Sequence, residues 1–120
     1  MSHTRTRRDL VVAALANLGI LAAGQDPSAE DFEAVDDHVD PMVAWLEATD
    51  ILDIDDIDAI VPEWFSPLSV ILADDAALEF GLPGVPRPQG EPDPRNVAID
   101  MIRLTTYGRP TYERLKIEYY

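Results

Sequence analysis

The chain has no cysteine and only two histidines among its 120 residues. The missing cysteine excludes disulfides, thiolate metal ligands and a cysteine nucleophile, and it is compatible with a reducing compartment. The longest apolar runs, VVAALANLGILAA and AIVPEWFSPLSVILA, are too short to span a membrane. Asn17 and Gly19 interrupt the first run, which favours an amphipathic helix over a signal peptide. We therefore expect a soluble protein that is not exported.

Side chains that carry catalytic chemistry are also scarce. His3 lies close to the N-terminus, and His38 lies beside Asp37 on the polar side of a predicted helix, where a solvated side chain is the simpler interpretation. The serines lack the context of a nucleophile elbow, and there is no glycine-rich phosphate loop or pair of histidines at metal-ligand spacing. The sequence therefore predicts no enzymatic activity, no cofactor and no metal site.

Cations are absent from most of the chain. No Lys or Arg occurs between Asp9 and Pro86, a range that holds eighteen Asp and Glu, and the nine cations are confined to residues 5–8 and 87–116. A formal net charge of −14 argues against nucleic-acid binding through this body, because affinity for phosphate depends on cations that displace counterions. Aspartate outnumbers glutamate fifteen to eight and lysine occurs once, which also fits adaptation to high salt.

The most acidic stretch is DILDIDDIDAI, at residues 50–60. As a calcium loop from residue 53 it fails, because Ile57 holds position five, Asp58 replaces Gly at position six and Trp64 replaces Glu at position twelve. The isoleucines recur every three residues and predict a loop anchored against two helices: Ile51, Ile54, Ile57 and Ile60. The aspartates would face outward as a candidate channel or inter-subunit surface: Asp50, Asp53, Asp55, Asp56 and Asp58.

Capping signals and helical periodicity predict two helices in the first half of the chain. The first spans about 7–18, with Thr6 and Asp9 at capping-box spacing. The second spans about 29–49, and we expect Pro41 to kink it because proline removes one backbone hydrogen bond. The positions predicted to face the core are Leu10, Val11, Ala14, Leu15, Leu18, Phe32, Val35, Val39, Met42 and Leu46.

Two more helices are predicted in the second half, separated by the loop GLPGVPRPQGEP. One spans about 62–80, in which Pro67 lies either inside the helix or at its first residue with Ser66 as cap. The other spans about 94–106, with Asp93 as its N-cap. The positions predicted to face the core are Trp64, Phe65, Leu68, Ile71, Leu72, Ala76, Leu78, Val97, Met101 and Leu104. The fold class is therefore all-α, a small four-helix domain with a long acidic loop between the second and third helices.

The tail RPTYERLKIEYY, residues 109–120, differs from the helical domain at 1–108. Its period-two pattern and Pro110 favour an extended arm or short strand. A lone strand leaves its backbone groups without partners, so we expect another chain to bind it by strand addition, the alternative being an arm that folds back or frays. The candidate partner-binding residues are Arg109, Tyr112, Arg114, Leu115, Lys116, Ile117, Tyr119 and Tyr120.

Three segments carry a family resemblance. They are RRDLVVAALANLGILAAGQDPSAEDFEAVDDHVDPMVAWLEATDI, then IDAIVPEWFSPLSVILADDAALEFG, then RLTTYGRPTYERLKIEYY. In this order they resemble the head-tail connector (head-completion or adaptor) proteins of tailed bacteriophages and related proviruses, over most of the chain. The most telling parts are DLVVAALANLGI, the AVDD-containing helix after it, and LADDAALEFG.

The resemblance implies a small helical protomer of the virion that assembles into a ring, commonly of twelve copies, beneath the portal. The ring would extend the DNA channel, let genomic DNA pass without specific binding, and support a tail-side completion or tail protein. It implies no membrane. The C-terminal arm would reach the portal, where Arg109, Arg114 and Lys116 would pair with acidic groups on the portal or on a neighbouring subunit.

Two other interpretations stay open from the residues alone. An acidic protein of this charge density could mimic DNA and inhibit a host nucleic-acid-binding protein, although the extended arm has no role in that function. The chain could also be a small adaptor of another partner, with an acidity that reflects only a saline host.

Overall fold

The structure, a computed structural model, describes residues 4–22 and 24–118, with side chains as far as residue 106. These residues form α1 (Arg7–Asn17), α2 (Ala29–Asp36), α3 (Val39–Ala48), α4 (Pro62–Ala76), the 3-10 helix η1 (Ala77–Phe80) and α5 (Pro94–Glu118). In these residues β pairing is limited to an isolated antiparallel bridge between Arg5 and Ile60. The predicted all-α fold class is confirmed.

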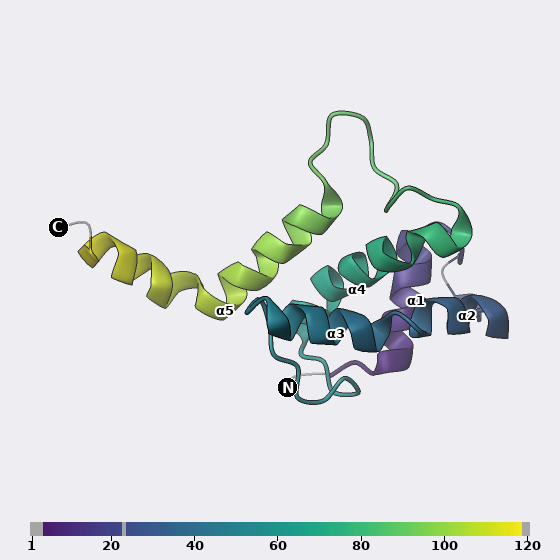
Figure 1. Cartoon of the computed structure of the whole chain (residues 1–120), viewed down its shortest axis with the longest axis horizontal. Coiled ribbons are helices and arrows are strands. Elements are labelled where there is room, and N and C mark those ends of the chain that lie inside the picture. Colours follow the sequence, from purple (N-terminus) through teal and green to yellow (C-terminus); the bar gives the residue numbers. More distant parts are fainter. Residues whose placement is uncertain (1–3, 23, 119–120) are drawn as a thin grey trace.

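Helix α4 is the centre of the fold. It contacts α1, α2, α3 and α5, and Figure 1 shows α1 crossing it steeply while α3 runs along its side. Fully buried side chains from these helices meet in one core: Leu10, Leu15, Val35, Met42, Leu46, Leu68, Ile71, Leu72 and Ile102. Burial of each such side chain is worth about 1.5–3 kcal/mol, so this core is the main source of cohesion between the helices.

The predicted helix starts are confirmed by their caps. The Thr6 hydroxyl accepts a hydrogen bond from the Asp9 N–H (3.2 Å), and the Asp9 carboxylate accepts one from the Thr6 N–H (3.1 Å). That backbone donor is the main reason why the pKa of Asp9 lies below its usual value. Ser28 caps α2 and Asp93 caps α5 in the same manner, through bonds from the Asp31 and Arg95 N–H groups.

The predicted helix over 29–49 is two helices, so the prediction of one kinked helix is wrong. Pro41 is the third residue of α3 and lacks the N–H that would bond the carbonyl of Asp37. The chain therefore breaks at Asp37 and His38, one turn before the proline. The ends are closed by bonds from the His38 N–H to the Val35 carbonyl (2.9 Å) and from the Met42 N–H to the His38 carbonyl (3.1 Å).

Helix α4 begins at Pro62 and contains Pro67 in its interior, which decides between the two predicted positions of that proline. The helix then tightens into η1. A 3-10 helix turns 120° per residue, whereas an α-helix turns 100°. The α-helical spacing therefore does not predict which residues of η1 face the core. Leu78, predicted to face the core, is 80% exposed.

The inner face of α5 also differs from the prediction. Ala98 and Ile102 are buried, whereas Val97, Met101 and Leu104 are 40%, 45% and 70% exposed. The helix carries two overlapping apolar stripes, and periodicity alone does not tell which of them meets the core. Ala98 and Ile102 meet the core, so the predicted inner face of Val97, Met101 and Leu104 is wrong.

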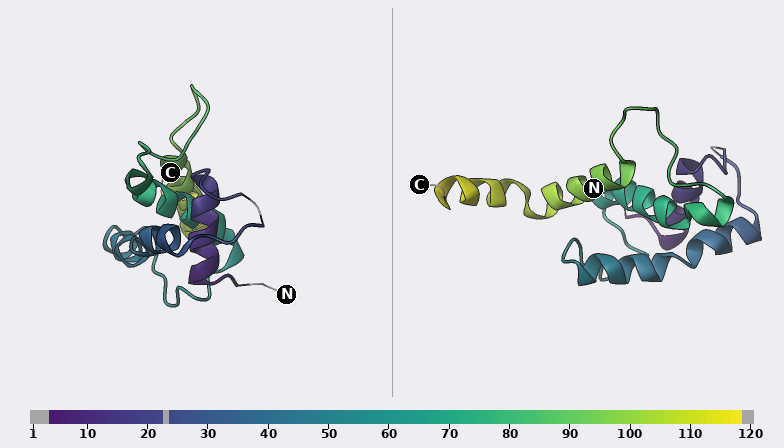
Figure 2. Two further views of the ribbon diagram at one scale, coloured as in Figure 1. Left: turned by 90° about the vertical axis from the view of Figure 1, so that its right-hand side faces the viewer. Right: turned by 45° about the horizontal axis from the view of Figure 1, so that its top comes forward.

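Helix α5 continues through Glu118, so the prediction of an extended arm is wrong over 109–118. Pro110 removes one backbone hydrogen bond, a loss that a long helix accommodates by bending. Figure 1 shows α5 changing direction in its second half and standing clear of the other helices, and Figure 2 shows the same projection from two more sides. The radius of gyration is 15.6 Å, against about 14 Å for a compact domain of this length. Tyr119 and Tyr120 lie outside the described residues.

Three helical segments end in one common geometry. One of the two residues after each has a left-handed conformation: Gly19 (φ 76°), Asp50 (φ 59°) and Gly81 (φ 74°). At the end of α3 the Ile51 N–H donates to the Leu46 carbonyl (3.0 Å), and the Asp50 N–H to the Glu47 carbonyl (3.1 Å), which is the Schellman pattern. Asp50 therefore occupies a position that glycine fills in the other two.

We predict that Gly19→Ala lowers the free energy of unfolding by about 1 kcal/mol, since the space around Gly19 is open and only the backbone conformation opposes the added Cβ. Urea denaturation measures this, and an unchanged free energy of unfolding would contradict the prediction.

Candidate functional site

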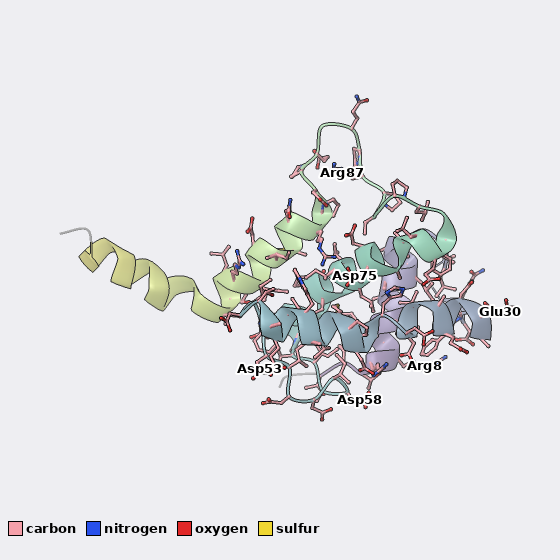
Figure 3. All side chains as sticks on the ribbon, in the orientation of Figure 1. Arg8, Glu30, Asp53, Asp58, Asp75 and Arg87 are labelled. Carbon is pink, nitrogen blue, oxygen red and sulfur yellow. The ribbon has the colours of Figure 1, made fainter. Side chains whose placement is uncertain are left out.

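The acidic corner, defined as Asp50, Asp53, Asp55, Asp56 and Asp58, lies on the loop between α3 and α4. All five aspartates are exposed. Ile51, Leu52 and Ile60 are buried, and Ile54 and Ile57 pack partly buried against the core, so the predicted anchored loop is confirmed. Figure 3 places Asp53 and Asp58 along the lower edge of the body.

The aspartates of the acidic corner differ in what they contact. Asp56 accepts a hydrogen bond from the Asp58 N–H (3.0 Å), and Asp58 accepts one from the Arg7 N–H (3.2 Å), so these two carboxylates shape the loop. Asp53 and Asp55 make no hydrogen bond or ion pair with the described part of the chain. Their carboxylates are the members of the corner most open to a partner or to solvent.

The N-terminal arginines hold the acidic body together, a role that the sequence reasoning missed. Arg5 and Ile60 exchange two backbone hydrogen bonds of 2.9 and 2.8 Å, which fasten the far end of the acidic loop to the start of the chain. The Arg5 guanidinium lies 4.1 Å from the centre of the Phe65 ring, and that of Arg8 lies 5.2 Å from the Phe32 ring. The sequence signal for this role was that all three cations of residues 1–86 lie within residues 5–8.

Arg7 bridges the break between α2 and α3. Its Nε donates to the Asp36 carboxylate (2.8 Å), its Nη1 to the Asp40 carboxylate (2.9 Å) and its Nη2 to the Asp36 carbonyl oxygen (3.2 Å). The hydrogen bond with Asp36 is the main cause that raises the pKa of Arg7. One guanidinium therefore fixes the end of α2 relative to the start of α3.

A second arginine fixes the direction of α5. The Nη1 of Arg95 donates to the Asp75 carboxylate (2.6 Å) and to the Asp74 carboxylate (3.2 Å) on α4. Its guanidinium also lies 4.8 Å from the centre of the Trp45 ring on α3. These contacts attach the first turn of α5 to two other helices, and so they set the direction in which its second half leaves the body.

The histidine at the α2–α3 break has a partner. A ring nitrogen of His38 lies 3.0 Å from the Glu79 carboxylate on η1, so the side chain is not simply solvated as predicted. His3 lies outside the described residues. Over residues 4–22 and 24–118, no group of three or more His, Asp or Glu is placed to hold a metal ion. In the same residues, no helix combines the length and the apolar character that crossing a bilayer requires.

Most of the predicted partner-binding residues share α5, a different element from the loop of the acidic corner. Six of them lie on the backbone of α5 between residues 109 and 117, beyond the last described side chain. The described part of α5 instead offers an apolar stripe that faces away from the core, formed by Val97, Met101 and Leu104. The molecule thus has two candidate surfaces, one acidic and one apolar, on separate elements.

We expect Arg7→Ala to lower the free energy of unfolding by about 1–2 kcal/mol, because it leaves Asp36 and Asp40 unpaired within an acidic body. Arg87→Ala is the matched control, since Arg87 is an arginine of the proline-rich loop with no hydrogen bond or ion pair in the described part of the chain. Thermal unfolding of both variants measures the difference. Equal loss from the two substitutions would show that Arg7 acts only through net charge.

We expect a similar loss, about 1–2 kcal/mol, from Arg95→Ala, because the Asp74 and Asp75 carboxylates would face each other without a cation. Arg103→Ala on the exposed side of the same helix should change the free energy of unfolding by less than about 0.5 kcal/mol. Tryptophan fluorescence should also change in the Arg95 variant, since the guanidinium over Trp45 is removed. If Arg95→Ala changed neither the free energy of unfolding nor the fluorescence, Arg95 would not be needed to anchor α5.

No protein-family model, no curated protein and no solved structure matches this chain. These comparisons therefore assign no function to the fold. What can be inferred about function comes from the two candidate surfaces, from the distribution of charge and from the residues that carry the resemblance to connector proteins.

Proposed function

We propose that this chain is a structural adaptor of a tailed virus, a protomer of a ring between the portal and the tail that extends the DNA channel. The resemblance in sequence suggests the family, and a ring of twelve copies is what that family implies. The observation that best supports an assembly role is α5, whose second half stands clear of the other helices and whose first half leaves Val97, Met101 and Leu104 40–70% exposed.

The projection of α5 supports binding to a second protein. An isolated helix gains little stability from its own hydrogen bonds, so a helix that leaves its body is expected to gain stability by packing on another surface. Residues 109–118, predicted to bind the portal, form its last turns. A helical partner-binding segment replaces the strand addition of the sequence-based prediction, and the proposed mode becomes a helix laid into a groove of the portal.

The distribution of charge supports passage of DNA. Residues 1–86 carry three cations against eighteen carboxylates, whereas residues 87–120 carry six cations against five. A channel wall with unpaired carboxylates such as Asp53 and Asp55 would repel phosphate and let genomic DNA move without binding. The more basic α5 would be free to contact acidic groups on the portal or on a neighbouring subunit.

We expect the purified protein to add a symmetric layer to the portal ring of the same virus, visible by negative-stain imaging and native mass spectrometry. Deletion of residues 109–120 should abolish this layer, because the proposed portal-binding turns are removed. The matched control is the double variant Asp53→Asn and Asp55→Asn, which should still bind the portal since both side chains lie elsewhere and make no contact in the folded chain.

Two results would count against the adaptor. Full portal binding after the deletion would remove the role of the C-terminal turns. A chain that never joins the portal and instead competes with DNA for a host protein would support the alternative of an acidic DNA mimic.

A further inference from the structure

Helix α3 is apolar on two sides. Its inner residues Val39, Met42 and Leu46 are buried in the core. Four exposed residues at helical spacing form its other apolar side, which we call the α3 outer face: Pro41, Ala44, Trp45 and Ala48. A surface helix of a globular protein normally has one apolar side that faces the core, so a second apolar side is notable on an acidic protein.

Trp45 is the largest side chain of the α3 outer face. Its ring is in contact with the Arg95 guanidinium of its own chain, yet the residue is still 38% exposed. The other three members are small, so they leave a shallow apolar surface beside the indole. Tryptophan next to small residues is a common centre for a protein interface, because the large ring gives contact area and the small residues let another helix approach.

Helix α5 also exposes apolar side chains. The α5 stripe, defined as Val97, Met101 and Leu104, consists of larger side chains that are 40–70% exposed and lie at helical spacing. Flexible side chains such as Met101 fill irregular apolar surfaces well. Two apolar helix faces, one shallow and one protruding, are therefore exposed on the same chain.

The charges beside these faces disfavour one of the possible pairings. All charged residues of α3 are acidic, and Asp40 and Glu47 are exposed next to its outer face. The α5 stripe is flanked by one exposed residue of each sign, Asp100 and Arg103. Two α3 outer faces would repel each other through like charges, whereas an α3 outer face and the electrically mixed surroundings of an α5 stripe would not.

We propose that the α3 outer face of one copy binds the α5 stripe of a second copy. The two surfaces are different, so the contact is head-to-tail, and repetition of one such contact around an axis closes a ring. The function of this contact, which is to build the ring, depends on the adaptor function proposed above. Its existence does not depend on the portal, because both surfaces belong to this chain.

The absence of native cysteine makes disulfide trapping a direct test. Two single variants of the full chain, Ala44→Cys and Met101→Cys, are mixed at high protein concentration over a series of salt concentrations and then oxidised. We expect the mixture to yield the mixed dimer well above either variant alone. Added salt should increase the yield because it screens the repulsion between acidic bodies.

Substitution separates this contact from non-specific apolar association. Leu104→Asp should abolish the trapped dimer and any native oligomer, since it places a carboxylate against an acidic face. Leu78→Asp is the matched control, because Leu78 is 80% exposed on η1 and belongs to neither face, and this substitution should leave the yield unchanged. Circular dichroism of both variants confirms that the helices are retained.

Three outcomes would overturn the inference. They are trapping of Met101→Cys with itself alone, equal loss from Leu104→Asp and Leu78→Asp, and a chain that stays monomeric and untrapped at every salt concentration. Oligomers that form without the mixed dimer would overturn the assigned faces while leaving the adaptor ring intact. A mixed dimer together with failure to join the portal would keep this contact and remove the adaptor function.

Discussion

The structure depends on a few arginines that hold an acidic body together. The three cations of residues 1–86 lie within four residues, and they face eighteen carboxylates. Arg7 alone contacts the end of α2 and the start of α3 with its side chain and the acidic loop with its backbone N–H. Because no other cation of the body is available, the arrangement of the loop and of the helix break depends on where α1 begins.

The same shortage of cations shapes the surface. Carboxylates without partners stay at the edges of the molecule, such as Asp53 and Asp55, where water screens them. Apolar side chains that lie outside the core are exposed on α3 and α5, such as Trp45 and Leu104. The result is a small domain with an acidic surface and two exposed apolar helix faces.

Local chemistry was predictable from the sequence, and the choice between competing faces was not. Thr6, Ser28 and Asp93 were recognised as caps because a short polar side chain before a helix satisfies free N–H groups. The isoleucines of the acidic loop were recognised from their spacing. Val97, Met101 and Leu104 were assigned to the core because α5 has two apolar stripes, and only the packing of Ala98 and Ile102 on α4 decides between them. The role of Arg7 was missed, because its partners are distant in sequence.

The bridge between Arg5 and Ile60 has a consequence for the order of folding. It joins the two ends of a segment that includes α1, α2, α3 and the acidic loop, so it closes a long stretch of chain. Closure of a long loop costs conformational entropy before its contacts compensate for it. We therefore expect the helices to condense first and the acidic corner to take its shape last, when the N-terminal residues dock beside it.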